Sequence, residues 1–309
     1  MHSKQDQYRD WIKDKKELPL FFQAWWLDIV CGGAAHWDVV LSKKKDETQG
    51  VFCFYKKTKF LQTYITQPPL TPVMGPWLVY PNNVQKRHSR YSFEQRVLED
   101  LAHQLPSYLA FKQKWHWQIE NYLPFYNRAY RAQLHYTYLW NNLNNKEEIW
   151  GNLANNVRGR IRQQQEHFEI KEMSSIAATL DLQNTILRNN GVKKPLDSQM
   201  VQLLWQAIQK YKGGKIFSAF DKDTYKLAAS ILVVYDQKEA YLLMSGHSTL
   251  GRSAGIPLLV WHAIHHLPAS IEVFNFEGSM LPAVEQFYRG FGGQRQPYLL
   301  LKKMKFLSL

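Results

Sequence analysis

The chain has little cysteine, since Cys31 and Cys53 are the only two among 309 residues. Two cysteines cannot build a disulfide scaffold, and this scarcity is typical of a reducing compartment. The first residues are polar and show no apolar core of a secretory signal. No apolar run approaches the ~20 residues of a membrane-spanning helix. We therefore expect a cytoplasmic protein without a transmembrane segment, in at most peripheral contact with a membrane.

Acidic residues are also few. The 26 Asp and Glu stand against 39 Lys and Arg, which gives a net charge of +13. The excess is spread along the chain and forms no basic tail. Such a charge favours anionic ligands such as phosphates, CoA, nucleotides, RNA or acidic lipid surfaces, and nothing in it indicates DNA. A basic surface without any such ligand is the alternative.

Aromatic residues, in contrast, are abundant, with 11 Trp and 17 Tyr. Aromatic side chains at this density build cores, and they also line sites for sugars, peptides or bases. A chain of this length predicts one large domain or two of ordinary size. The polar, turn-rich stretch 141–148 is the expected junction between domains 1–145 and 146–309.

Apolar periodicity and turn residues predict alternating helices and strands. Helices are expected over 20–31, 92–104 (with Ser92 as N-cap), 147–166, 174–189, 197–211, 254–267 and 280–289, and strands over 36–41, 50–57, 114–120, 132–138, 215–220, 226–235, 239–245, 271–276 and 297–302. Hairpins followed by crossover helices argue for mixed, mostly antiparallel sheets flanked by helices. The predicted class is therefore α+β, and the two halves are compatible with two copies of one fold.

The turn after strand 239–245 has the features of an anion site. A strand leads into a loop of small residues, and a helix begins at its end, where free backbone N–H groups would meet an anion. The candidate residues are Gly246, Gly251, Arg252, Ser253, Ala254 and Gly255. An ordinary turn capped by Ser253 is the alternative. The segment is not a P-loop, because no Gly-Lys-Ser/Thr follows.

Two further groups are candidates for substrate binding. Arg158 and Arg162 lie one turn apart on the predicted helix 147–166, and arginine forks suit phosphate. The alternative is a solvated charged helix face. The Pro-rich segment 66–77 is too apolar for a free linker, so we expect an ordered loop near a site, with Trp77 as a contact.

Candidate catalytic residues surround the end of strand 271–276. Glu277 follows the strand among aromatic residues, where its pKa would rise and it could accept a proton. Tyr288 and Arg289 stand one helix later. The alternatives are that Glu277 caps the next helix and that Arg289 binds carbonyl groups at its end.

The histidines do not predict a metal site. His262 and His266 share a helix face with His265 nearby, but no glutamate stands where the His-Glu-x-x-His zinc pattern needs one. There is also no Gly-x-Ser-x-Gly elbow, which argues against a serine hydrolase.

Several segments together resemble the acyl-CoA N-acyltransferase (GNAT-like) superfamily, in particular its branch of FemAB-like transferases and BioF2-like acetyltransferase domains. These segments occur in the order of the family over nearly the whole chain: Phe22–Asp28, Gln67–Pro76, Asn156–Arg162, Phe276–Met280 and Phe287–Gly293. The resemblance implies two tandem GNAT-like domains with a substrate cleft between them. FemAB-like members add amino acids from aminoacyl-tRNA to a peptidoglycan precursor, and they carry a Phe-Lys pair where this chain has Phe287-Tyr288.

The resemblance implies an N-acyltransferase that moves an acetyl or aminoacyl group to an amine on a cell-wall, sugar or peptide-like acceptor. Acyl-CoA or aminoacyl-tRNA would be the donor, and no metal would take part. Glu277 or Tyr288 would handle the proton, and the 246–255 turn would hold the donor's phosphates. The rival hypothesis is a catalytically inactive module of the same fold that binds a nucleotide-sugar, a cell-wall precursor or RNA.

Overall fold

The structure of the chain is a computed structural model that describes residues 3–15, 17–251 and 255–304. The chain forms two compact units. The first contains Met1–His135 with Pro297–Leu309, and the second contains Tyr136–Gln296. The chain passes from the first unit to the second after His135, ten residues before the domain boundary expected at residue 145. The end of the chain, from Pro297, belongs to the first unit.

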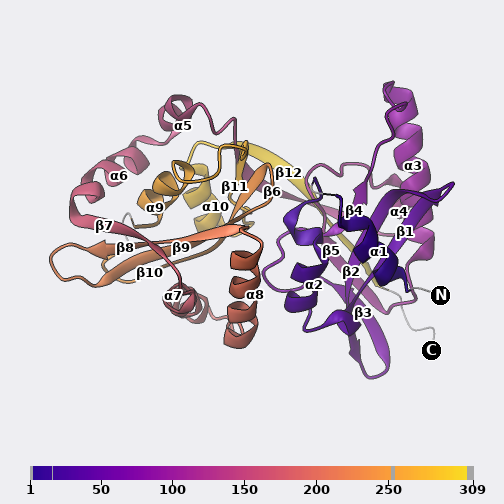
Figure 1. The fold of residues 1–309 in the computed structure, drawn as a ribbon, viewed down its shortest axis with the longest axis horizontal. Helices are drawn as coiled ribbons and strands as arrows, with labels where there is room; N and C mark the ends of the chain where they lie inside the picture. The colour runs from indigo at the N-terminus through magenta and orange to yellow at the C-terminus, as the bar shows by residue number, and fades with distance from the viewer. Residues whose placement is uncertain (1–2, 16, 252–254, 305–309) are drawn as a thin grey trace. The chain divides into compact units, whose positions relative to one another are not determined.

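The first unit is a mixed sheet with helices on it (Figure 1). Its strands run in the order β1-β2-β3-β5-β12, with β4 paired to β2, and all pair antiparallel except β3 with β5. The elements are α1 (Lys4–Ile12), α2 (Ala24–Val30), β1 (Trp37–Lys44), β2 (Glu47–Lys59), β3 (Gln62–Thr66), β4 (Gly75–Leu78), α3 (Arg87–Gln104), β5 (Ala110–Lys114), α4 (Leu123–Tyr126) and β12 (Gln294–Met304).

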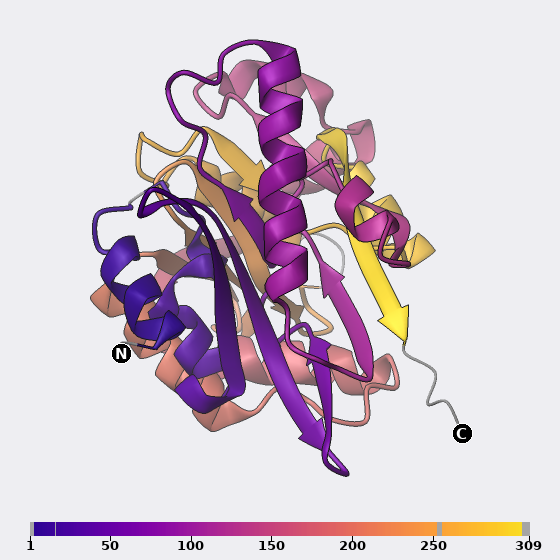
Figure 2. The same ribbon diagram turned by 90° about the vertical axis from the view of Figure 1, so that its right-hand side faces the viewer.

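Helix α3 lies across one face of this sheet (Figure 2). Its buried residues Val97, Leu98 and Leu101 recur at helical spacing and join a cluster of aromatic residues from the strands. Gly50 on β2 allows the close approach, because a Cβ there would lie 2.4 Å from Val97 Cγ1. The helix thereby anchors the residues that follow β4 and β5.

The second unit is also a mixed sheet, in the order β6-β11-β10-β9-β8-β7. Among its described strands, β10 and β11 pair in parallel and the other neighbours pair antiparallel. The elements are β6 (Arg131–Asn141), α5 (Lys146–Asn152), α6 (Asn155–His167), β7 (Phe168–Met173), α7 (Ala177–Asn189), α8 (Ser198–Lys210), β8 (Gly214–Asp221), β9 (Leu227–Tyr235), β10 (Glu239–His247), α9 (Gly255–Ile264), β11 (Val273–Asn275) and α10 (Pro282–Arg289).

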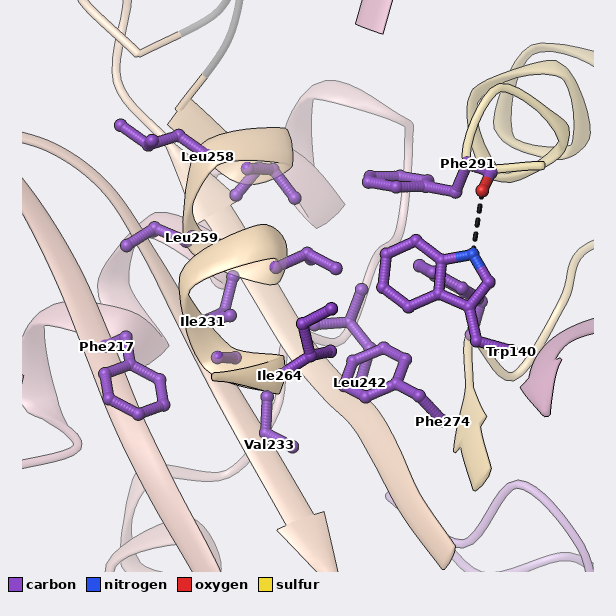
Figure 3. Close-up of a cluster of buried hydrophobic side chains, with 14 of the residues drawn as sticks. Trp140, Phe217, Ile231, Val233, Leu242, Leu258, Leu259, Ile264, Phe274 and Phe291 are labelled. Carbon is purple, nitrogen blue, oxygen red and sulfur yellow. Dashed lines mark hydrogen bonds between the residues drawn. The ribbon is translucent and has the colours of Figure 1, made fainter. Parts of the chain in front are cut away.

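The core of the second unit lies between α9 and the strands (Figure 3). Leu258, Leu259 and Ile264 of α9 pack on inward-facing residues of β8, β9 and β10. Trp140 closes the core near β11, and its indole N–H donates to the carbonyl of Phe291 at 2.8 Å. This bond ties the end of α10 to the sheet.

The two halves of the chain repeat one order of elements. Two helices, a run of antiparallel strands, a helix, a strand, a helix and a last strand follow one another from α1 to β6 and again from α7 to β12, while α5, α6 and β7 stand between the two copies. The last strand of each copy joins the sheet that the other copy forms: β6 pairs with β11 in the second unit, and β12 pairs with β5 in the first. The predicted α+β class with mixed, mostly antiparallel sheets is confirmed, and the expected duplication is visible as this repeated order.

Three predicted elements were wrong. The helix expected over 147–166 is two helices, because Ala154 is extended and its N–H donates to the carbonyl of Gly290. The strand expected over 114–120 is instead β5, which ends at Lys114. Ser92 is not an N-cap, since α3 already begins at Arg87.

Candidate functional site

The end of β11 is fixed by a buried hydrogen-bond network. Asn275 Oδ1 accepts from Thr137 Oγ1 at 2.6 Å and from the backbone N–H of Glu277 at 2.8 Å, and Asn275 Nδ2 donates to Glu239 Oε1 at 2.8 Å. The side chains of Thr137, Glu239 and Asn275 are buried. A buried network whose members bond one another is rigid. It therefore sets the position of Glu277, two residues after Asn275.

Glu277 sits on a strained turn. Its φ is 61° and that of Gly278 is 64°. A residue with a Cβ in this left-handed region costs roughly 1–2 kcal/mol relative to the right-handed one. A Cβ at Gly278 would lie 2.0 Å from the carbonyl oxygen of Tyr136, so only glycine fits there. Strain of this kind is often found at functional sites, and here it presents a half-buried carboxylate at the end of a strand.

Tyr288 lies within the electrostatic reach of Glu277. Burial raises the pKa of Tyr288 well above its ordinary value, and the charge of Glu277 raises it further. The Tyr288 ring packs 5.8 Å from that of Phe276 on the strand. The phenol therefore stays protonated at neutral pH and can act as a hydrogen-bond donor. The structure brings these two predicted residues together.

Tyr241 belongs to the same region and was missed by the sequence. It is fully buried on β10 beside Asn275 in the parallel register. Burial raises its pKa most, followed by the charge of Glu239 and, less strongly, that of Glu277. In the sequence Tyr241 is one of many tyrosines in apolar strands, so nothing marks it out.

Arg289 makes its described contact elsewhere. Its guanidinium pairs with Glu285 at 3.4 Å, one turn earlier on α10, and its side chain is 64% exposed. Glu285 also accepts a hydrogen bond from the hydroxyl of Tyr138. Arg289 thus belongs to a polar cluster on the surface of α10.

The glycines of the turn after β10 pack against protein. A Cβ at Gly251 would lie 2.1 Å from the carbonyl oxygen of Ala228, one at Gly255 would lie 2.5 Å from the Cβ of Ala229, and one at Gly246 would crowd α7. They therefore allow close packing on β9 and α7. The other predicted members of this turn, residues 252–254, lie outside the described residues.

The edge of β10 near this turn has an internal partner. Strand β11 pairs with β10 only as far as Tyr241, while β10 continues to His247 with a register shift after Leu242. Beyond that point the backbone N–H of Ser245 donates to the side-chain oxygen of Gln183, from α7, at 2.9 Å. Gln183 thereby takes a backbone donor that a ligand lying along β10 would otherwise use.

Arg158 and Arg162 meet at Trp150. Arg158 donates to the carbonyl of Gly151 at 3.2 Å and to the side chain of Asn155, so it caps the end of α5. The Arg162 guanidinium lies 5.4 Å from the centre of the Trp150 ring. Both arginines thus stabilise the junction of α5 and α6, in addition to any ligand they hold.

Trp77 lines a cavity of about 510 Å³ within the first unit. Its edge packs on the ring of His116 at 5.2 Å. The cavity is formed by β4, the first turns of α3 and the segment after β5, and it combines aromatic, cationic, carboxylate and amide side chains: Trp77, Leu78, Tyr80, Arg87, Arg90, Tyr91, Glu94, Leu98, Trp117, Gln118, Ile119, Glu120 and Asn121.

One wall of this cavity is held by ion pairing. Glu94 accepts from Tyr80 at 2.8 Å and pairs with Arg90 at 3.2 Å, and the Arg90 guanidinium lies 4.4 Å from the Tyr80 ring. Burial, followed by the neighbouring Glu94, raises the pKa of Tyr80 to about 12. The cavity suits a polar ligand with a flat or ring-shaped part. Sequence reasoning found only Trp77, because no local pattern shows that the first turns of α3 and the segment after β5 lie against β4.

Histidines at and just beyond the end of α9 stack on one another. His262 and His266 lie 3.9 Å apart between ring centres, and burial together with the neighbouring histidines lowers the pKa of His262 to about 4. Across the described residues, no three His, Cys, Asp or Glu side chains are grouped so that they could hold a metal ion. In the same part of the chain, no helix is long and apolar enough to cross a membrane.

Comparison with solved structures identifies the fold. The crystal structure of FemX superposes with a TM-score of 0.64 and covers 97% of this chain and 96% of its own, at 10% sequence identity. The chain has the fold of FemX. This confirms the expected FemAB-like fold, although FemX and the chain share few identical residues.

Two further structures are similar over most of their length. A conserved protein of unknown function from Bacteroides thetaiotaomicron has a TM-score of 0.51 at 9% identity, and it covers 90% of this chain and 91% of its own. The C-terminal domain of a putative lysylphosphatidylglycerol synthetase from Agrobacterium fabrum also has a TM-score of 0.51, at 13% identity, and covers 87% and 85%. No sequence family and no curated protein matches the chain.

Proposed function

We propose that this chain is an N-acyltransferase, which moves an acetyl or aminoacyl group from an activated donor to an amine on a cell-wall, sugar or peptide-like acceptor. The observation that carries the proposal is that the Glu277 carboxylate, just after β11, lies within electrostatic reach of the protonated phenol of Tyr288 on α10, in a chain with the FemX fold. Lysylphosphatidylglycerol, which names the similar synthetase domain, is itself an aminoacyl group joined to an acceptor.

The two side chains fit the two proton transfers of this reaction. The acceptor nitrogen attacks the acyl carbonyl, so a C–N bond forms and the donor's C–S or C–O bond breaks. Glu277 accepts the proton that the nitrogen loses. Tyr288, kept protonated by its raised pKa, donates a proton to the leaving sulfur or oxygen. A proton passed from Glu277 back to Tyr288 restores both groups.

The donor would bind through its phosphates. We assign this role to the turn between β10 and α9, where Gly255 begins a helix of 10 residues. Acyl-CoA is the simpler donor, and aminoacyl-tRNA is the alternative that the FemAB-like resemblance implies. A cytoplasmic setting fits either donor, and Cys31 and Cys53 are both free thiols.

Acyl transfer to an amine, measured in vitro with acetyl-CoA and with aminoacyl-tRNA, tests the proposal. We expect Glu277→Gln to lower kcat/KM by about 10²–10⁴-fold, the usual contribution of a general base. Tyr288→Phe should lower kcat more than it raises KM. Glu272→Gln is the matched control, because Glu272 is an exposed carboxylate just before β11. Activity that survives both site changes would show that the reaction uses other residues.

A second candidate is a module of the same fold that binds without catalysing. It is favoured by the Gln183 side chain on the Ser245 N–H, which occupies an edge of β10 that a donor could use. Thermal-shift measurements with CoA, acetyl-CoA, UDP-sugars and tRNA discriminate the two. Ligand at 100 times its dissociation constant stabilises the folded state by about 2.7 kcal/mol. Stabilisation by CoA alone argues for the transferase, whereas stabilisation by a UDP-sugar or tRNA without any acyl transfer argues for the module.

A further inference from the structure

The hairpin between β2 and β3 carries an unusual tip. Lys59 pairs with Gln62, so the loop between the strands consists of Phe60 and Leu61. Their φ angles are 49° and 60°. Two-residue loops with positive φ at both positions normally hold Asn and Gly, because bulky side chains are strained there. Figure 2 shows this hairpin extending past the neighbouring strands of the first unit's sheet.

Both tip side chains are exposed to solvent. Phe60 is 84% and Leu61 is 97% exposed, so folding buries almost nothing of either. The one described contact of the Phe60 ring is with the ammonium group of Lys59, 5.2 Å from its centre. The tip therefore carries both backbone strain and exposed apolar side chains, and neither stabilises the folded chain by itself. This combination points to a partner that binds the tip.

The surface beside the tip is positive. Lys57, Lys59 and Lys112 are exposed and line a hollow of about 320 Å³ with Tyr64. No Asp or Glu occurs between residues 48 and 93. Lys112 is also close to other positive charges. Burial is the largest cause that lowers the pKa of His135, and the charges of Lys114, Lys302 and Lys112 lower it further. An anionic surface is therefore the complementary partner.

We propose that the Phe60–Leu61 tip enters the interfacial layer of an anionic phospholipid bilayer, while Lys57, Lys59 and Lys112 contact the lipid phosphates. Apolar side chains that enter the headgroup boundary, with lysines around them, are the combination that holds peripheral proteins on acidic membranes. A single-stranded nucleic acid would stack on an aromatic face in the basic hollow, where Tyr64 lies, but stacking gives no role to the exposed side chain of Leu61. The inference goes beyond the proposed acyl transfer and does not depend on it.

Co-sedimentation with vesicles tests the proposal. Phosphatidylcholine vesicles that contain about a third phosphatidylglycerol should bind the protein, and pure phosphatidylcholine vesicles should bind it far more weakly. The double change Phe60→Asn and Leu61→Gly should weaken binding at least tenfold, because it removes both apolar side chains. The same change should keep or raise the melting temperature, since Asn-Gly suits this turn. Lys57→Gln and Lys59→Gln should each weaken binding about fivefold.

Tyr225→Asn is the matched control. Tyr225 is also an exposed large side chain (79%) with a positive φ of 57°, but it lies in the β8–β9 hairpin near Asp221 and Asp223. Its change should leave vesicle binding intact. A polarity-sensitive dye on Phe60→Cys should shift to the blue with anionic vesicles, and Cys31 and Cys53 are buried, which directs labelling to the new thiol.

Three results would overturn the proposal. The first is that the protein fails to bind anionic vesicles or binds neutral vesicles equally well. Alternatively, the double change at the tip leaves vesicle binding unaltered. Lastly, poly(U) RNA binds in a lysine-dependent way that ignores the tip while vesicles do not bind, which would assign the basic surface to nucleic acid.

Discussion

Gly278 holds the turn that presents Glu277, and replacing it with alanine should disrupt the second unit. Its φ of 64° lies in the left-handed region, where a Cβ costs roughly 1–2 kcal/mol. The new Cβ would also stand 2.0 Å from the carbonyl oxygen of Tyr136 and 2.6 Å from the Cα of Thr137. Both neighbours are backbone atoms of β6, so they can move only with the sheet, and overpacking of this kind typically costs about 1–3 kcal/mol. Together, Gly278→Ala should lower the free energy of unfolding by about 3 kcal/mol.

Urea unfolding, followed by circular dichroism, measures the change. Gly159→Ala is the control, because Gly159 lies inside α6 and a Cβ there would meet nothing within 4 Å. Alanine should stabilise that helix by up to ~1 kcal/mol. The same chemical change should therefore act in opposite directions at the two positions. Equal stability of Gly278→Ala and the unchanged chain would refute the strain and the close approach together.

Other predictions concern stability. Trp140→Phe removes the indole donor to the carbonyl of Phe291 and should lower unfolding free energy by about 1–3 kcal/mol in urea titrations; no loss would mean that water replaces the bond. Asp197→Ala removes the cap on the N–H of Met200 and should cost about 1 kcal/mol, most visibly in amide exchange of α8; unchanged exchange would contradict it. The pKa of His262 is about 4 in the folded chain and 6.5 in the unfolded chain, so between these pH values the unfolded chain binds more protons. The free energy of unfolding should therefore decline as the pH drops from 6.5 to about 4. His262→Gln should flatten that part of the pH–stability profile, and an unchanged slope would assign it to other groups.

Periodic patterns in the sequence located most elements of the second unit. Strands 226–235 and 239–245 and helix 197–211 match β9, β10 and α8 closely, because long apolar or amphipathic runs have only one way to bury themselves. The break between α5 and α6 escaped prediction, since the apolar spacing continues through Leu153. A tertiary bond from Ala154 to Gly290 decides the backbone there, and no local pattern reports it.

The candidate site also has features that the sequence predicts and features that it does not. Glu277 and Tyr288 could be proposed from the sequence, because the apolar pattern shows the strand that ends before Glu277 and the helix that carries Tyr288. The network through Asn275, Thr137 and Glu239 could not, since it joins residues from three strands that are far apart in sequence. The cavity around Trp77 was missed for the same reason, as its walls come from β4, α3 and the segment after β5.

The exchange of last strands has a consequence for synthesis on the ribosome. The sheet of the first unit needs β12, whose Leu300–Met304 pair with β5, and these residues leave the ribosome only after the second unit. The first unit therefore waits with an open edge at β5 while the second unit is being made, and exposed edges of this kind invite pairing with other chains. Pairing across such a long stretch of chain is also slow. Truncation of only the final strand should accordingly harm the N-terminal half of the protein more than the half to which the cut is closest.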